Sequence, residues 1–285
     1  MKLGVIADCF RQNLAENIRL AGELGLNGVQ IYATNGEFSP GNLDAEKKAF
    51  YKRLLAENRL VVSALCGDLG GFGFEIAEDN PARIEKTKQI IDFAVEFETK
   101  AVTTHIGVIP SDREHPRYQV MLKALTECGR YAQQRGVTLA IETGPETAHT
   151  LLQFLQDTDG GVGVNLDPAN FVMVTGQDPV EAVHLLKDYI VHTHVKDGIM
   201  LKKSDPQEIY HCFAVGGIEG LNIADYFIET PVGQGNVDFV AYFGALKQIG
   251  YDGFLTIERE TGANPSADIE CAVKYVQSVL GQMRN

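Results

Sequence analysis

The chain of 285 residues lacks several features that would assign it to common classes of protein. It contains no hydrophobic run long enough to cross a membrane, so we expect no transmembrane helix and no membrane partner. Its five cysteines are odd in number and include no Cys-X-X-Cys pair, which indicates a reduced, cytoplasmic protein without a disulfide framework. No Gly-X-Gly-X-X-Gly motif follows the first predicted strand, which argues against an open dinucleotide-binding sheet.

Positive charge is also scarce. The chain has 25 Lys and Arg residues against 38 Asp and Glu residues, a formal net charge of −13. Proteins that hold nucleic acid through phosphate contacts usually show the opposite balance, so we expect no nucleic-acid partner. The composition is 45% hydrophobic and 22% charged, which is typical of a globular protein and excludes bulk disorder.

One pattern recurs eight times along the chain: a short apolar run, a loop and an amphipathic helix. Nearly continuous apolar runs suit strands that are buried on both faces of a parallel sheet. Eight successive βαβ units predict an α/β protein that closes into a (β/α)8 TIM barrel, with residues 1–285 forming a single domain. The predicted strands are residues 3–7, 28–33, 60–65, 101–106, 137–142, 162–167, 190–195 and 254–258.

The longest interval between predicted strands is residues 196–253, after the seventh strand. We expect it to contain a long loop, around residues 198–235, that covers or borders the mouth of the barrel and is more mobile than the strands.

Ionisable residues gather at the carboxyl ends of the last four predicted strands. Glu142 ends the fifth strand, Asp167 ends the sixth, His192 and His194 share one face of the seventh, and Glu258 ends the eighth. Strand ends converge at the mouth of a barrel, where unpaired carboxylates would repel one another. A divalent cation removes this conflict. Three carboxylate oxygens and one imidazole nitrogen suit Mn²⁺, Mg²⁺ or Co²⁺, with Zn²⁺ less specifically indicated.

Four sequence strings carry a resemblance to a known family. IETGPE, VNLDPAN, HTHVKD and PVGQGNVDF…GYDGFLTIERE resemble the motifs of the sugar phosphate isomerase/epimerase family, whose xylose-isomerase-like TIM barrel is related to that of the ketose 3-epimerases. The resemblance covers the whole chain and is strongest over residues 137–260. The metal ligands that it implies are Glu142, Asp167, His194 and Glu258. It therefore selects the second histidine of HTHVKD, and we expect His192 one layer deeper in a structural role.

The chain departs from the family pattern at one position. Ketose 3-epimerases and DNA-repair members place a histidine three residues after the sixth-strand aspartate, where this chain has Asn170. Asparagine is a poorer metal ligand, although it still hydrogen-bonds a substrate hydroxyl. The seven histidines of the chain leave few ligands for the three-zinc cluster of AP endonuclease relatives, so we do not favour a DNA-repair hydrolase.

Together these features predict a divalent-metal-dependent isomerase or epimerase of a keto sugar or a related polyol ketone. One ion, preferably Mn²⁺, would keep two adjacent coordination positions for the carbonyl and hydroxyl oxygens of the substrate. Proton transfer next to the carbonyl would pass through a metal-stabilised enediolate. Glu142 and Glu258 would be the catalytic residues, on opposite sides of the ketone and each with a free carboxylate oxygen.

Four further residues are predicted to bind substrate: His105, Asn170, Lys196 and Glu146. For His105 an equal alternative is that it only plugs the top of the barrel. Lys196 is expected either to reach a substrate oxygen or to pair with Asp197, and Glu146 either to bind a sugar hydroxyl or to lie solvated in a loop.

Three other functions remain open from the residues. A metal-dependent lyase would use the same enolate for β-elimination from 3-keto-glycosides, and release of the aglycone would distinguish it. A sugar-binding protein without catalysis and an AP endonuclease-like hydrolase are less favoured. The partner is expected to be a small sugar, and the resemblance suggests a homo-oligomer, either a dimer or a tetramer.

Overall fold

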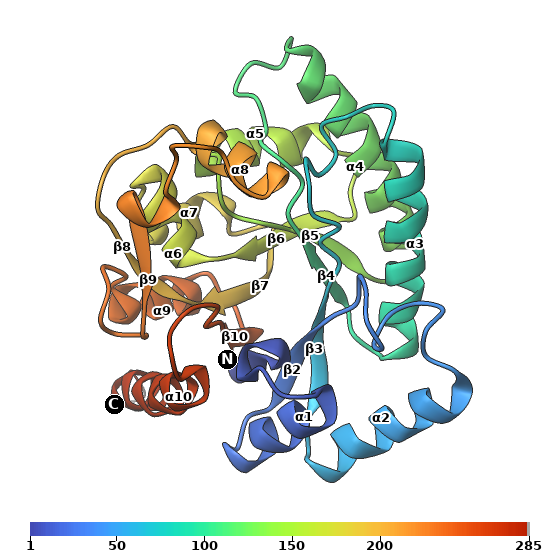
Figure 1. Ribbon diagram of the computed structural model, residues 1–285, viewed down its shortest axis with the longest axis vertical. Helices are drawn as coiled ribbons and strands as arrows, with labels where there is room; N and C mark the ends of the chain where they lie inside the picture. The colour runs from blue at the N-terminus through green and yellow to red at the C-terminus, as the bar shows by residue number, and fades with distance from the viewer. Residues whose placement is uncertain (284–285) are drawn as a thin grey trace.

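The computed structural model describes residues 1–283 and contains a closed barrel of eight parallel strands (Figure 1). The strand order is β1-β10-β7-β6-β5-β4-β3-β2, so the last barrel strand closes the barrel against the first. This confirms the predicted (β/α)8 fold, and each predicted strand overlaps the strand observed there. The barrel strands are β1 (Lys2–Ile6), β2 (Gly28–Tyr32), β3 (Val61–Cys66), β4 (Ala101–Thr104), β5 (Thr138–Glu142), β6 (Val162–Leu166), β7 (Ile190–Val195) and β10 (Phe254–Ile257).

Helices surround the barrel, and local sequence signals determine where several of them begin (Figure 1). The side chains of Asn13, Asp44 and Asp238 each accept a backbone N–H from the first turn of the helix that follows. The main helices are α1 (Leu14–Glu23), α2 (Ala45–Glu57), α3 (Asn80–Glu96), α4 (Pro116–Gln134), α5 (Ala148–Asp157), α7 (Pro179–Leu186), α9 (Phe239–Gln248) and α10 (Pro265–Gln282). None of the described helices combines the length and the apolar character that a membrane span requires.

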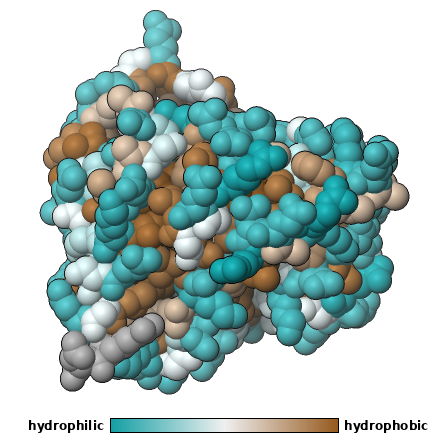
Figure 2. Space-filling view, turned by 90° about the horizontal axis from the view of Figure 1, so that it is seen from below, coloured by the Kyte–Doolittle hydropathy of each residue, from teal (hydrophilic) through white to brown (hydrophobic). Residues whose placement is uncertain are grey.

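Apolar side chains of these helices pack on the outside of the barrel and form one continuous core with the strands. On the face seen in Figure 2, hydrophobic residues show mainly in the recesses between polar side chains. This is the pattern expected when amphipathic helices bury one side against the strands and expose the other to water.

The centre of the barrel is polar rather than filled only by aliphatic side chains. His192 lies there, with Nδ1 2.9 Å from Asn165 Oδ1 and Nε2 3.0 Å from Thr256 Oγ1. Nearby, Gln30 Nε2 donates to Thr103 Oγ1 over 3.1 Å. All five side chains are buried, and each has a hydrogen-bond partner, as buried polar groups require. This layer forms the floor beneath the carboxyl ends of the strands.

The sequence predicts a long loop after β7, but the segment there contains regular elements. It contains β8 (Asp197–Met200), α8 (Pro206–Val215) and β9 (Phe227–Thr230), and β8 pairs with β9 in a separate antiparallel ribbon. Asp197 anchors its base, because its carboxylate accepts the backbone N–H groups of Gly198, Gly233, Gly235 and Val237. As predicted, the segment borders the mouth, since residues of α8 and β9 line the cavity there.

Candidate metal centre and active site

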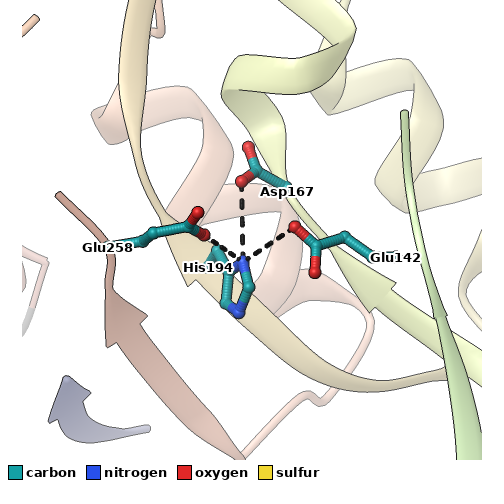
Figure 3. A group of neighbouring side chains, drawn as sticks. All are labelled: Glu142, Asp167, His194 and Glu258. Atoms are coloured by element: carbon teal, nitrogen blue, oxygen red, sulfur yellow. Dashed lines mark ion pairs between the residues drawn. The ribbon is translucent and has the colours of Figure 1, made fainter. Parts of the chain in front are cut away.

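Four side chains from neighbouring strands meet at the mouth of the barrel (Figure 3). Glu142 is the last residue of β5, Asp167 follows β6 directly, His194 lies near the end of β7, and Glu258 follows β10 directly. One potential ligand atom from each residue lies within 4.8 Å of the others. The four side chains therefore converge on one point, as the positions of the strand ends predict. Among the described residues, no second group of three or more such side chains is close enough to hold a metal ion.

His194 lies at the centre of the cluster, with its Nδ1 facing all three carboxylates (Figure 3). Nδ1 is 2.6 Å from Glu258 Oε2, 3.4 Å from Glu142 Oε1 and 3.5 Å from Asp167 Oδ2. Burial alone would lower the pKa of His194, but the carboxylates of Glu142 and Glu258 raise it well above its ordinary value. Positive charge is therefore strongly favoured at this point.

Three atoms of the cluster fit a bound cation. Asp167 Oδ2, His194 Nδ1 and Glu258 Oε2 are buried and have no aligned hydrogen-bond partner, although such atoms are normally satisfied. Two carboxylate oxygens and an imidazole nitrogen directed at one point are ligands that divalent cations accept. The cluster could thus hold a metal ion, with Glu142 Oε1 as the fourth donor.

The neighbours of His194 and Asp167 direct the correct atoms toward this point. His194 Nε2 lies 3.0 Å from Gln30 Oε1, and a proton on Nε2 leaves the Nδ1 lone pair free for a cation. Asp167 caps the short helix α6 (Pro168–Asn170), and its Oδ1 accepts the N–H groups of Ala169 and Asn170. Only Oδ2 of Asp167 is left for the centre. Sequence reasoning missed Gln30, whose signal is one polar residue within the apolar strand β2.

Lys196 pairs with the centre itself rather than with Asp197. Its Nζ lies 2.6 Å from Glu258 Oε1 and 2.6 Å from Glu260 Oε2. Burial lowers the pKa of Lys196, but Glu258 and Glu260 raise it well above its ordinary value. Burial also raises the pKa of Glu258, yet Lys196 and His194 together hold it below its ordinary value. The predicted pairing of Lys196 with Asp197 is wrong, because Asp197 is occupied by backbone N–H groups.

The expectation that both glutamates keep a free carboxylate oxygen is also wrong. Glu258 Oε1 is held by Lys196, and Glu142 Oε2 accepts the amide of Asn165 over 3.3 Å. These second oxygens are therefore fixed by the protein, which orients each carboxylate toward His194.

The remaining predicted substrate-binding residues lie at different places. His105 lines the cavity, with Nδ1 3.2 Å from Asp68 Oδ2 and Nε2 4.0 Å from Glu142 Oε1. Although burial lowers the pKa of His105, Glu142 and Asp68 raise it above its ordinary value. Asn170 also lines the cavity, but its Nδ2 donates to the backbone oxygen of Thr143.

Glu146 is buried rather than solvated, and neither of its carboxyl oxygens has a hydrogen-bond partner. Burial raises its pKa to about 8. It is not among the described residues that line the cavity, but it lies close enough to His105 for the charge of that imidazole to lower its pKa in part.

A cavity of about 1060 Å³ opens above the cluster and is lined by Glu142, His194, Lys196 and Glu258. Its outer wall is formed by the segment between β3 and α3 and by α8. Sequence reasoning missed Tyr210 and His211 of α8, because nothing in a single helix indicates which distant strand ends it will cover.

Comparison with known proteins agrees with this architecture. A family model described as xylose isomerase-like TIM barrel matches residues 18–279. An uncharacterized protein of Methanocaldococcus jannaschii is 23% identical over 98% of this chain and 90% of its own length. An inosose dehydratase of Lacticaseibacillus casei is 24% identical over 57% of this chain, and the match spans about half of that enzyme, 55% of its length.

Solved structures share the fold over nearly the whole chain. A xylose isomerase domain protein from Planctomyces limnophilus superposes with a TM-score of 0.79 at 24% identity, covering 100% of this chain and 98% of that one. A D-tagatose 3-epimerase-like protein gives 0.74 at 20% identity, covering 99% and 100%. The IOLI protein, solved with a zinc atom, gives 0.75 at 18% identity, covering 99% of both chains.

Proposed function

The chain belongs to the family of xylose isomerase-like TIM barrels, and we propose that it is a divalent-metal-dependent isomerase or epimerase of a keto sugar or a related polyol ketone. The observation that carries the proposal is the cluster of Glu142, Asp167, His194 and Glu258 beside an open cavity, in which buried atoms of the last three have no aligned hydrogen-bond partner. Relatives in the comparisons named as epimerases or dehydratases support chemistry next to a ketone.

The four residues of the cluster would hold one divalent ion, for which we propose Mn²⁺. Its hard oxygen donors favour Mn²⁺ or Mg²⁺, while the single imidazole also admits Zn²⁺. Similar structures solved with magnesium and with zinc support a divalent ion without selecting one. When bound, the ion would supply Lewis-acid polarisation of the substrate carbonyl.

The two glutamates of the chain would move the proton. They lie on opposite sides of His194, from β5 and from the end of β10 (Figure 3). One glutamate, as the carboxylate, removes the proton from the carbon next to the carbonyl, and the other, as the carboxylic acid, donates its proton to the opposite face, which inverts the configuration. The second oxygens accept one hydrogen bond each, from Asn165 and from Lys196, which orient the carboxylates and leave a lone pair on each of these oxygens for the proton.

A specific observation supports a second candidate, β-elimination from a 3-keto-glycoside or a related ketone. Two cationic groups, Lys196 and His105, line the cavity beside the carboxylates. Elimination requires one base for the carbon-bound proton and one acid for the departing oxygen, and either cation could supply the latter. The similarity to inosose dehydratases supports the same alternative.

The decisive measurement is exchange of deuterium from D₂O into the carbon next to the carbonyl. A panel of keto sugars is incubated with chelated protein, with and without added Mn²⁺. We expect exchange only with the ion present, and loss of exchange in Glu142→Gln and Glu258→Gln. Full exchange in both variants would contradict the two-base scheme. Release of water or aglycone without an epimerised product would favour the lyase instead.

A further inference from the structure

The cavity above the cluster is larger than a keto sugar requires. Its volume of about 1060 Å³ lies just above the range, roughly 300–1,000 Å³, of pockets that bury drug-sized ligands. A free monosaccharide bound at the four-residue cluster would leave the outer part of this cavity to water. The lining of that outer part therefore indicates what else the substrate carries.

Several aromatic side chains line the outer part. Phe72, from the segment between β3 and α3, lies opposite His211 of α8, with ring centroids 5.5 Å apart and planes inclined by 40°. Next to His211 in the sequence, Tyr210 has its ring centroid 5.9 Å from that of Phe213 and 6.0 Å from that of His105. We call Phe72, Tyr210, His211 and Phe213 the aromatic tier.

The aromatic tier is continuous with the catalytic cluster. All four of its residues line the same cavity as Glu142 and Glu258. The Tyr210 hydroxyl approaches the backbone of Gly144 so closely that a Cβ there would lie 2.1 Å away. Tyr210 thus reaches from α8 to the end of β5, next to the strand end that carries Glu142. A ligand can therefore contact the cluster and the aromatic tier at once.

Charge in the cavity argues against an anionic ligand. Arg117 and Lys196 are the only Arg and Lys among the described residues that line it. Arg117 Nη1 is 3.1 Å from Glu75 Oε2, and Lys196 is held by Glu258, so both are already paired with carboxylates. Asp205 and Glu208 add negative charge at the mouth. His105 also lines the cavity, and its Nδ1 lies 3.2 Å from Asp68 Oδ2. A phosphate or carboxylate would therefore meet acidic side chains and would have to compete with them for each of these cations.

We propose that the aromatic tier is a subsite for an uncharged aromatic substituent of the keto sugar, so that the substrate is an aryl-bearing sugar rather than a free or phosphorylated one. The planar substituent stacks among the four rings while the sugar lies against the cluster. The placement of the sugar over the four-residue cluster rests on the proposed function. Binding of the aryl group to the aromatic tier can be measured without turnover.

Saturation-transfer NMR and calorimetry of the Mn²⁺-loaded protein test this with three probes. They are methyl β-D-glucoside, phenyl β-D-glucoside and glucose 6-phosphate. We expect the phenyl glucoside to bind about fivefold more tightly than the methyl glucoside, in the range of an aromatic stacking contact. Glucose 6-phosphate should bind more weakly than both.

Two exposed residues of α8 make a matched pair of variants. Phe213 is 55% exposed and lines the cavity, whereas Val215 is 47% exposed and lies outside it. Phe213→Ala should reduce the preference for the phenyl probe about threefold, and Val215→Ala should leave it unchanged.

Several results would overturn the proposal. These are equal affinity for phenyl and methyl glucosides, absence of phenyl glucoside binding, or tighter binding of glucose 6-phosphate. A change of oligomeric state in Phe213→Ala with an intact aryl preference would assign the aromatic residues to contacts between copies of this chain.

Deuterium exchange tests the catalytic function separately. A preference for the phenyl probe without deuterium exchange would contradict only the proposed function. Deuterium exchange without that preference would contradict only the proposed aryl subsite.

Discussion

The Nζ of Lys196 lies 2.6 Å from Oε1 of Glu258, and both side chains are buried beside the unpartnered atoms of the cluster. An ionised carboxylate in such a place is costly unless a partner compensates it. Lys196 compensates one oxygen of Glu258, and His194 faces the other. The pair thus keeps Glu258 ionised and oriented toward the centre.

Replacing Lys196 by Met should destabilise the metal-free protein by about 3 kcal/mol, because Glu258 would lose its buried partner. Added Mn²⁺ should recover part of this loss by interacting with the same carboxylate. Urea unfolding of the variant with and without Mn²⁺ measures both effects. The control is Lys274→Met, which removes an exposed ion pair with Glu270 and should cost less than about 0.5 kcal/mol. Equal losses in the two variants would refute the role given to Lys196.

Gln30→Leu should weaken metal binding by about 10- to 100-fold, because His194 Nε2 would lose the acceptor that orients its ring. Titration calorimetry with Mn²⁺ measures the change. Thr103→Val is the matched control. It removes only the hydrogen bond that Gln30 Nε2 donates to Thr103 Oγ1, so it should weaken metal binding less. Unchanged affinity in Gln30→Leu would show that the ring is held by other contacts.

The two histidines of β7 should respond differently to truncation. His194→Ala should release the metal and abolish activity while the fold survives. His192→Ala should retain the metal but lower stability by about 2 kcal/mol, because Asn165 and Thr256 would lose a buried partner. Metal content and melting temperature of both purified variants provide the test. Loss of metal from His192→Ala alone would place the centre one layer deeper in the barrel.

Asp157 should contribute to the loss of stability in acid. Burial raises its pKa, but hydrogen bonds from Tyr118 and Arg113 outweigh this and lower it below the ordinary value. Its stabilising effect is therefore complete above the unfolded pKa, about 3.9, and disappears as the pH falls through the lower pKa of the folded state. Asp157→Asn should cost about 1 kcal/mol at pH 7 and much less at pH 2. Urea unfolding at the two pH values checks this, and a cost that does not depend on pH would contradict it.

Much of the fold could be predicted from the sequence because parallel barrel strands are buried on both faces and give short apolar runs between amphipathic helices. The same reasoning located Glu142, Asp167 and Glu258, which lie at or directly after strand ends. The segment after β7 was harder, because β8 and β9 are short and pair only with each other. Short isolated strands carry little hydrophobic periodicity, so a loop was expected there.

Some contacts could not be read from any local pattern. Gln30 and His194 are separated by 164 positions, and Lys196 and Glu258 by 62, so only closure of the barrel brings each pair together. Lys196 pairs with Glu258 and Glu260 rather than with the adjacent Asp197. The reason is that backbone N–H groups from a distant loop already occupy the Asp197 carboxylate.

The eight-unit barrel and the carboxylates at its mouth follow from the sequence, because strand period and position along a strand are local properties, whereas the choice of His194 over His192 came from the family resemblance. Tertiary structure alone decided which carboxylate oxygens face the centre, which imidazole nitrogen does so, and which aromatic rings cover it. Those choices depend on hydrogen bonds and packing between elements far apart in the chain. Such contacts arise only when the strands have closed and α8 has folded over the mouth.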